Sequence, residues 1–91
     1  MADITVSAVD GTFAVEVRAG RSDPTHHAVT VPPGYAEALG WDRGDEQLVR
    51  ASFEFLLERE PATSILRRFS LDVIEGYFPE YRTDITARRL G

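Results

Sequence analysis

The chain has 91 residues, of which 43% are hydrophobic, and it carries a formal net charge of −5. That length predicts a single domain over residues 1–91, and the apolar fraction is sufficient for a packed interior, which excludes wholesale disorder. The absence of cysteine excludes disulfide bonds, thiolate metal sites and cysteine nucleophiles. The acidic charge repels phosphate backbones and anionic membranes, so nucleic-acid binding is disfavoured.

The N-terminal residues Met1 to Thr5 contain neither a basic region nor a long apolar run. No stretch of the sequence approaches the roughly 20 apolar residues that a membrane-spanning helix needs. We therefore expect a cytoplasmic protein. All basic residues are arginine, so a lysine Schiff base and a phosphate-loop lysine are excluded.

The first third of the sequence alternates apolar and polar residues, the period-2 pattern of half-buried strands. The segments with this pattern are 3–9, 12–19 and 25–31. Asp10-Gly11 suits the tight turn of a hairpin, and Pro32-Pro33 ends the third strand because proline cannot donate to a ladder. The pattern predicts a three-stranded, mainly antiparallel sheet within residues 3–31.

The rest of the sequence predicts helices that pack on this sheet in an α+β fold. They are expected at about 34–40, 45–60, 64–69 and 71–78, followed by a frayed tail over 86–91. Asp42 or Asp45 is expected to cap the main helix, and Pro61 forbids its continuation.

The main helix, 45–60, is apolar around most of its circumference. Its narrow polar face carries Arg50, Glu54 and Glu58. Such a helix must be covered on two sides. The sheet can cover one side, and the other needs the C-terminal helices or a second chain. Because a three-stranded sheet covers too little of the helix, we expect a homodimer.

No residue pattern predicts a catalytic, cofactor or metal site. His26 and His27 point to opposite faces of a strand, so they cannot easily share one ion. Ser52 lies within the apolar stripe of the main helix, where a hydrogen bond to its own helix is expected. The glycines form no phosphate-binding motif. We expect a protein that is not an enzyme, with a small enzyme of unrecognised site as one alternative.

Basic and aromatic residues in the second half of the sequence are candidates for partner binding. Arg67, Arg68 and Tyr81 lie in the locally basic last third, and Tyr35 and Trp41 lie beside turns where aromatic side chains can anchor a partner. The alternatives are a solvated helix face for the arginines and a core role for the aromatic rings.

Residues 26–60 carry a strand that ends in proline, a helix with Tyr35-Ala36-x-Ala38-Leu39, a glycine-containing turn, and a second helix with Leu48-Val49-Arg50-x-Ser52-Phe53. This order resembles the ribbon-helix-helix family of DNA-binding regulators and antitoxins. The resemblance implies that two chains pair their strands into a ribbon in the major groove, with His26, Ala28 and Thr30 facing the DNA.

The sequence thus predicts a small protein-interaction or regulatory module without enzymatic activity, which binds itself or another protein. A ribbon-helix-helix-like DNA-binding regulator or antitoxin is the alternative.

Overall fold

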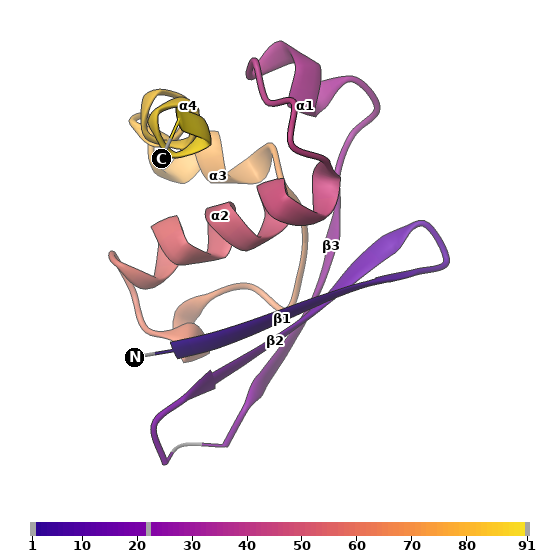
Figure 1. The fold of residues 1–91 in the computed structure, drawn as a ribbon. Coiled ribbons are helices and arrows are strands. Elements are labelled where there is room, and N and C mark those ends of the chain that lie inside the picture. Colours follow the sequence, from indigo (N-terminus) through magenta and orange to yellow (C-terminus); the bar gives the residue numbers. More distant parts are fainter. Residues whose placement is uncertain (1, 22, 91) are drawn as a thin grey trace.

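The computed structural model describes residues 2–21 and 23–90 as a four-stranded sheet with its helices on one face (Figure 1). The strands are β1 (Ala2–Val9), β2 (Thr12–Ala19), β3 (Thr25–Thr30) and β4 (Arg68–Ser70), and they lie in that order across the sheet. The helices are α1 (Tyr35–Ala38), α2 (Asp45–Leu57), the 3-10 turn η1 (Ala62–Ser64), α3 (Val73–Tyr77) and α4 (Tyr81–Leu90). The α+β class predicted from the sequence is therefore confirmed.

The first two strands form the hairpin that the sequence predicts. Asp10 and Gly11 both have positive φ, 49° and 78°, as the two central residues of a tight hairpin turn require. Val6 pairs with Val15 in the resulting antiparallel register, and both side chains are buried toward the helices. The third strand pairs antiparallel with β2 and ends before the two prolines, which is also as predicted.

The fourth strand was not predicted, and the helix expected over 64–69 does not form. Backbone after η1 is extended, with Ile65 at φ −76° and ψ 134°, and Arg68–Ser70 pairs in parallel with β3. Ile65 and Phe69 therefore turn inward from an extended segment. The physical reason is that β3 would otherwise leave one row of backbone hydrogen-bonding groups unpaired beside the core.

The main helix α2 lies between two layers, with the sheet on one side and α4 on the other (Figure 1). Its side chains Leu48, Val49, Phe53 and Phe55 are fully buried. The helix ends at Leu57, three residues earlier than predicted. The residue before it is Gly44, at φ 90° and without a side-chain cap, so the predicted aspartate cap is wrong.

Other elements of the same chain cover the apolar surface of α2. Tyr81 and Ile85 of α4 are completely buried, and Phe55 packs against Tyr81 with 5.2 Å between ring centroids. The predicted fraying of 86–91 is wrong up to Leu90, where α4 ends, and Gly91 lies outside the described residues. Because α4 supplies the second cover, the width of the apolar surface no longer argues for a second chain.

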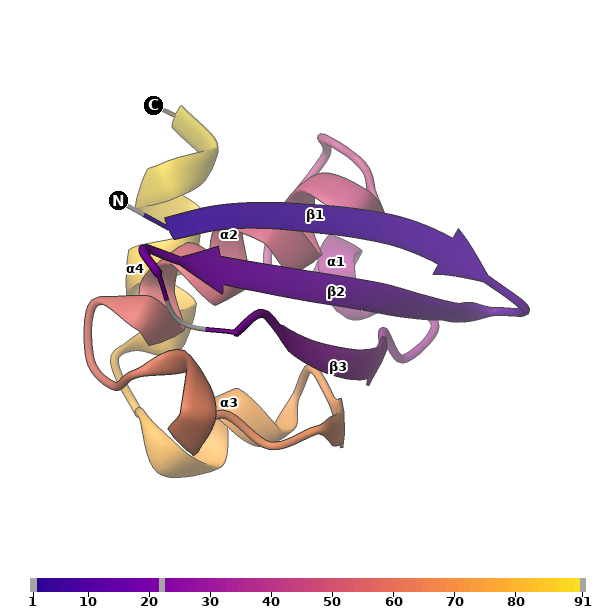
Figure 2. The same ribbon diagram turned by 90° about the horizontal axis from the view of Figure 1, so that it is seen from below.

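In residues 2–21 and 23–90, no other element lies on the face of the sheet opposite the helices (Figure 2). This face presents His26, Ala28 and Thr30 of β3, the residues expected to face DNA in a ribbon-helix-helix protein; His26 and Thr30 are exposed and Ala28 is half-buried. However, β3 pairs with β2 on one edge and with β4 on the other. At Ala28 and Val29 both edges of the strand are occupied, so a ribbon with a second chain, as the resemblance implies, has no free edge there.

We expect truncation of Phe53 to destabilise the fold strongly, because this ring is completely buried between α2, β3 and β4 and contacts His27 and Phe69. Phe53→Ala should lower the free energy of unfolding by about 3–5 kcal/mol. Chemical denaturation followed by circular dichroism measures the change. Glu54→Ala, an exposed neighbour on the same helix, is the control and should change stability by less than about 0.5 kcal/mol. Equal effects of the two variants would contradict this packing.

Candidate functional site

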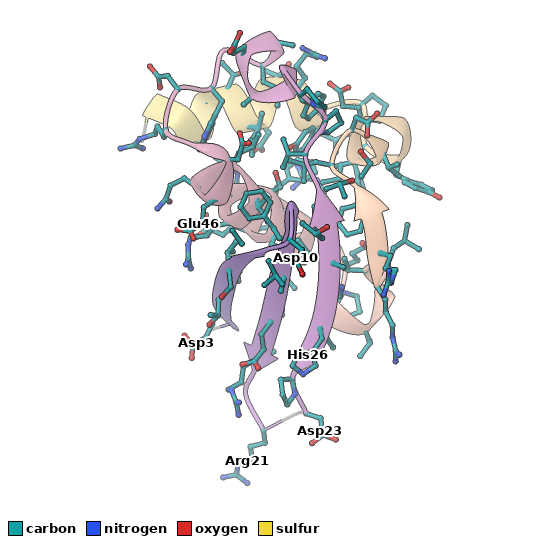
Figure 3. All side chains as sticks on the ribbon, turned by 90° about the vertical axis from the view of Figure 1, so that its right-hand side faces the viewer. Asp3, Asp10, Arg21, Asp23, His26 and Glu46 are labelled. Carbon is teal, nitrogen blue, oxygen red and sulfur yellow. The ribbon has the colours of Figure 1, made fainter. Side chains whose placement is uncertain are left out.

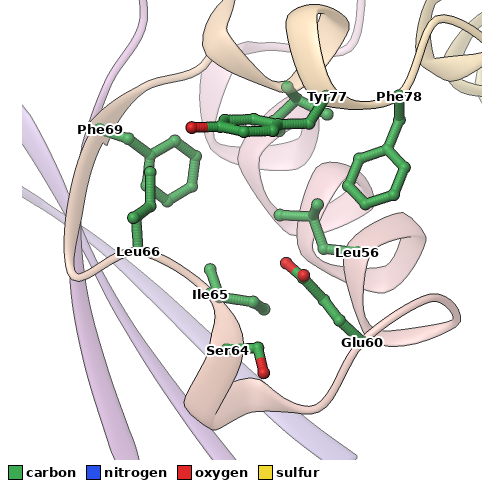
Figure 4. Close-up of a pocket in the computed structure, with 9 residues that line it drawn as sticks. Leu56, Glu60, Ser64, Ile65, Leu66, Phe69, Tyr77 and Phe78 are labelled. Carbon is green, nitrogen blue, oxygen red and sulfur yellow. The ribbon is translucent and has the colours of Figure 1, made fainter.

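An apolar groove of about 210 Å³ lies between the segment 64–69, the end of α2 and the helix α3 (Figure 4). We call it the Leu66–Tyr77 groove. The residues that line it are Leu56, Glu60, Ser64, Ile65, Leu66, Phe69, Ile74, Tyr77 and Phe78. Leu56, Ile65 and Ile74 form its buried floor, whereas Leu66 is 51% exposed and Tyr77 69% exposed at its rim. An aliphatic or aromatic side chain entering the groove would lose its contact with water on several sides.

Aromatic contacts with the core fix the walls of the groove. Phe69 packs on Phe53 at 6.0 Å between ring centroids, and Phe78 meets Phe55 edge-to-face at 5.8 Å. Both partners on α2 are completely buried, so each wall packs against the hydrophobic core. The amide of Phe78 also donates to the carbonyl of Ile74 at 2.8 Å, which closes α3. The groove is therefore preformed by packing.

His27 holds the strand side of the groove in place. Its Nδ1 lies 2.8 Å from the carbonyl oxygen of Leu66, and its Nε2 lies 2.9 Å from the hydroxyl of Thr25. A neutral ring that donates from Nδ1 and accepts at Nε2 satisfies both contacts. The buried ring also packs edge-to-face on Phe53 at 5.2 Å. His27 therefore positions the backbone of Leu66, while His26 points to the opposite, open face, as predicted.

The strand β4 forms the outer edge of the sheet beside the groove (Figure 3). The amide of Ala28 donates to the carbonyl of Arg67 at 2.7 Å, and the amide of Leu71 donates to the carbonyl of Thr30 at 2.8 Å. Because backbone groups of alternate residues point to opposite sides of a strand, those of Arg68 and Ser70 point away from β3. Within the described part of the chain, this free edge carries a short row of donors and acceptors without a backbone partner.

Two arginines at this edge have no acidic partner. Arg67 and Arg68 are exposed, and their side chains form no ion pair or hydrogen bond with the residues whose side chains the structure describes. Arg59 differs sharply, because it lies over the Phe55 ring at 3.7 Å and pairs with Glu58, Glu80 and Asp84. The two edge arginines are thus available to an acidic ligand.

The sequence analysis named five candidate partner-binding residues, and only Arg67 and Arg68 lie at the surface. Tyr35, Trp41 and Tyr81 are 9%, 6% and 0% exposed. Trp41 donates from its ring nitrogen to the carbonyl of Gly44 at 2.9 Å, and Tyr81 packs on α2. These rings complete a small core instead of projecting from it, so the prediction that they anchor a partner is corrected.

The most perturbed ionisable groups are buried tyrosines away from the groove. Burial raises the pKa of Tyr81 to about 12 and raises that of Tyr35 above its usual value, with further contributions from neighbouring groups. The hydroxyl of Tyr81 lies 2.6 Å from Oγ of Ser52, which donates to the carbonyl of Leu48 at 2.7 Å, as predicted for this serine. Neither tyrosine lines the Leu66–Tyr77 groove.

Metal-ligating side chains do not gather in the part of the chain that the structure describes: no group of three histidine or carboxylate residues is placed to hold an ion. In the same residues, no helix has both the length and the apolar character to cross a bilayer.

The groove residues Leu66, Phe69, Tyr77 and Phe78 were assigned to helix faces from the sequence and were not named as a site. A signal was present, because residues 66–78 combine two adjacent arginines with several large apolar residues. Their convergence depends on Phe69 lying in a strand that pairs with β3, which local periodicity does not reveal.

Comparisons with protein-family models, with curated proteins and with solved structures found no match to this chain.

Alkaline pH is expected to destabilise the protein through Tyr81. An unfolded tyrosine ionises near pH 10, whereas folded Tyr81 keeps its proton to about pH 12. Its contribution to stability is therefore complete below pH 10 and is lost as pH rises toward 12, by about 1.4 kcal/mol per pH unit for each such tyrosine. Denaturant titrations between pH 8 and 12 measure the slope.

The variant Tyr81→Phe isolates this effect. It should be less stable at neutral pH, because Ser52 loses one of its two hydrogen-bond partners, yet its stability should fall less steeply above pH 10. Parallel curves for the two proteins across the alkaline range would contradict the assignment to Tyr81.

Proposed function

We propose that this protein is a non-enzymatic interaction module that binds another protein through the Leu66–Tyr77 groove. The observation that carries the proposal is the exposure of Leu66 and Tyr77 on the rim of a groove whose floor is apolar and buried. Large exposed apolar side chains that meet at a concave surface are typical of a ligand or partner site.

The geometry of the groove supports binding of a side chain from a partner. Its volume of about 210 Å³ suits one or two aliphatic or aromatic side chains rather than a whole cofactor. Among the described lining residues, Glu60 and Ser64 supply polar groups at the end remote from α3, and the hydroxyl of Tyr77 is a further polar group at the rim. The buried tyrosines with raised pKa do not line the groove, so it lacks the convergence of a cavity and perturbed groups that marks many active sites.

The other predicted roles have less support. DNA binding as in the ribbon-helix-helix family requires a strand pair between two chains, and at Ala28 and Val29 both edges of β3 are occupied within one chain. The homodimer was expected because α2 needed a second cover, which α4 provides. A partner protein of different sequence is therefore the proposed ligand of the groove.

A charge placed on the rim of the groove should abolish binding. The probe is a phage-displayed library of random peptides, selected on the wild-type protein. Peptides that bind the groove should lose about tenfold or more in affinity for Leu66→Glu, because the introduced carboxylate meets an apolar ligand without a partner. Fluorescence anisotropy of the synthesised peptides measures the affinities.

Val9→Glu is the matched control, because Val9 is also 51% exposed and its substitution makes the same change of charge at the opposite edge of the sheet. Peptide affinity should be the same for this variant as for the wild type. A failure to enrich any peptide, or equal losses in the two variants, would refute the proposed function.

A further inference from the structure

The free edge of β4 and the Leu66–Tyr77 groove lie side by side, which defines how a partner is held. We propose that the partner segment binds in an extended conformation as a fifth strand on β4, and that its sequence alternates apolar and acidic residues. This inference rests on the proposed function, since it specifies the ligand of the same groove.

Backbone hydrogen bonding at β4 supports strand addition. Leu71 and Arg67 bond toward β3, so the N–H and C=O groups of Arg68 and Ser70 point outward, where no further strand of the described residues pairs with them (Figure 3). An added strand would use these groups directly, as peptides do when they extend a sheet. Because β4 has only three residues, this contact is short and side-chain contacts must supplement it.

The other edge of the sheet lacks these features. The carbonyl of Ile4 on β1 already accepts a hydrogen bond from Arg50 of α2. The hollow beside β1 is lined mainly by charged residues, among them Glu16, Arg18 and Glu54, and contains no apolar floor. The combination of unused backbone groups and an apolar groove therefore occurs at β4.

The two faces of β4 predict the alternation in the partner. Phe69 turns toward the helices and lines the groove, whereas Arg68 pairs with Ala28 and belongs to the open face. Side chains of an added strand alternate in the same way, at about 5 Å from their neighbours on β4. Residues on the helix side would enter the groove, and residues on the open side would lie beside Arg68.

The positive charge of Arg68 determines which residues of the partner fit on the open face of the sheet. Arg68 and Arg67 are exposed and make no ion pair among the described side chains, although the protein as a whole carries a net charge of −5. A carboxylate opposite Arg68 is the complementary partner, and a basic residue there would be repelled. An extended segment with apolar and acidic residues in alternation satisfies the groove, the edge and the arginines together.

The test uses the full chain and a blocked heptapeptide, Thr-Glu-Leu-Glu-Leu-Glu-Thr, titrated to about 1 mM and followed by amide NMR. We expect shifts at Leu66, Phe69 and Tyr77 and slower hydrogen exchange of the Arg68 and Ser70 amides. The peptide Glu-Glu-Glu-Leu-Leu-Thr-Thr has the same composition without alternation and should bind about tenfold more weakly or not at all. Equal binding of the two peptides would overturn the inference.

Backbone methylation of the peptide separates strand addition from simple insertion of a side chain. Two peptide series carry N-methyl groups on alternate residues, so only one series blocks the edge that faces β4. That series should lose about tenfold in affinity and the other should bind nearly as the parent does. If groove-dependent binding persists in both series, the partner is not a strand, whereas the proposed function stands.

Arg68→Glu tests the charge. It should weaken binding of the acidic peptide and strengthen binding of the peptide with lysine in place of glutamate. Arg21→Glu makes the same change of charge at the tip of the β2–β3 loop, far from β4 (Figure 3), and should have little effect. Equal effects of the two variants would show that only the net charge of the protein matters. They would overturn the proposed pairing of Arg68 with an acidic residue. A dimer of the chain alone that dissociates with Leu66→Glu would show a second copy in the groove, and would also overturn the inference.

Discussion

The burial of α2 is the constraint on which the rest of the structure depends. Ser52, Phe53 and Phe55 are completely buried on different sides of this helix, so it needs cover over most of its circumference. A sheet gives an apolar helix one layer of cover, and the chain must then return across the opposite side. The helix α4, anchored by Tyr81 and Ile85, makes that return and completes a three-layer domain from a short chain.

The groove forms where the layers that cover α2 meet around its C-terminal half. Around the C-terminal half of α2, the chain passes from η1 to β4 and then from α3 to α4, and each passage contributes an aromatic residue to the core. Phe69 and Phe78 pack against opposite sides of α2, and Leu56 and Ile65 form the floor of the groove between them. The same packing that stabilises the fold therefore preforms the site. Binding a ligand would require little further ordering of the protein.

The sequence predicted the strands with alternating patterns and the long helix, because their burial follows a period that local residues express. Val15, Val17 and Val29 all face the core as their parity indicates. It mispredicted residues 64–69, where Ile65 and Phe69 share a face in a helix and also turn inward from an extended segment. Pairing of Arg68–Ser70 with β3 favours the extended segment over the helix. Local residue patterns do not indicate such long-range pairing. The site depends on that segment, so only Arg67 and Arg68 were named in advance.

The two edges of the sheet are protected in different ways, and the difference bears on specificity. On the long strand β1, the carbonyl of Ile4 already accepts a hydrogen bond from Arg50. The strand β4 has only three residues, and such a short edge is poorly able to pair with another strand. A three-residue edge offers too few hydrogen bonds to hold a strand by backbone contact alone. A segment gains enough contact only when its side chains also fill the groove and meet Arg68, so the edge rejects most extended chains. The shortness of β4 thus limits aggregation and makes recognition depend on side-chain sequence.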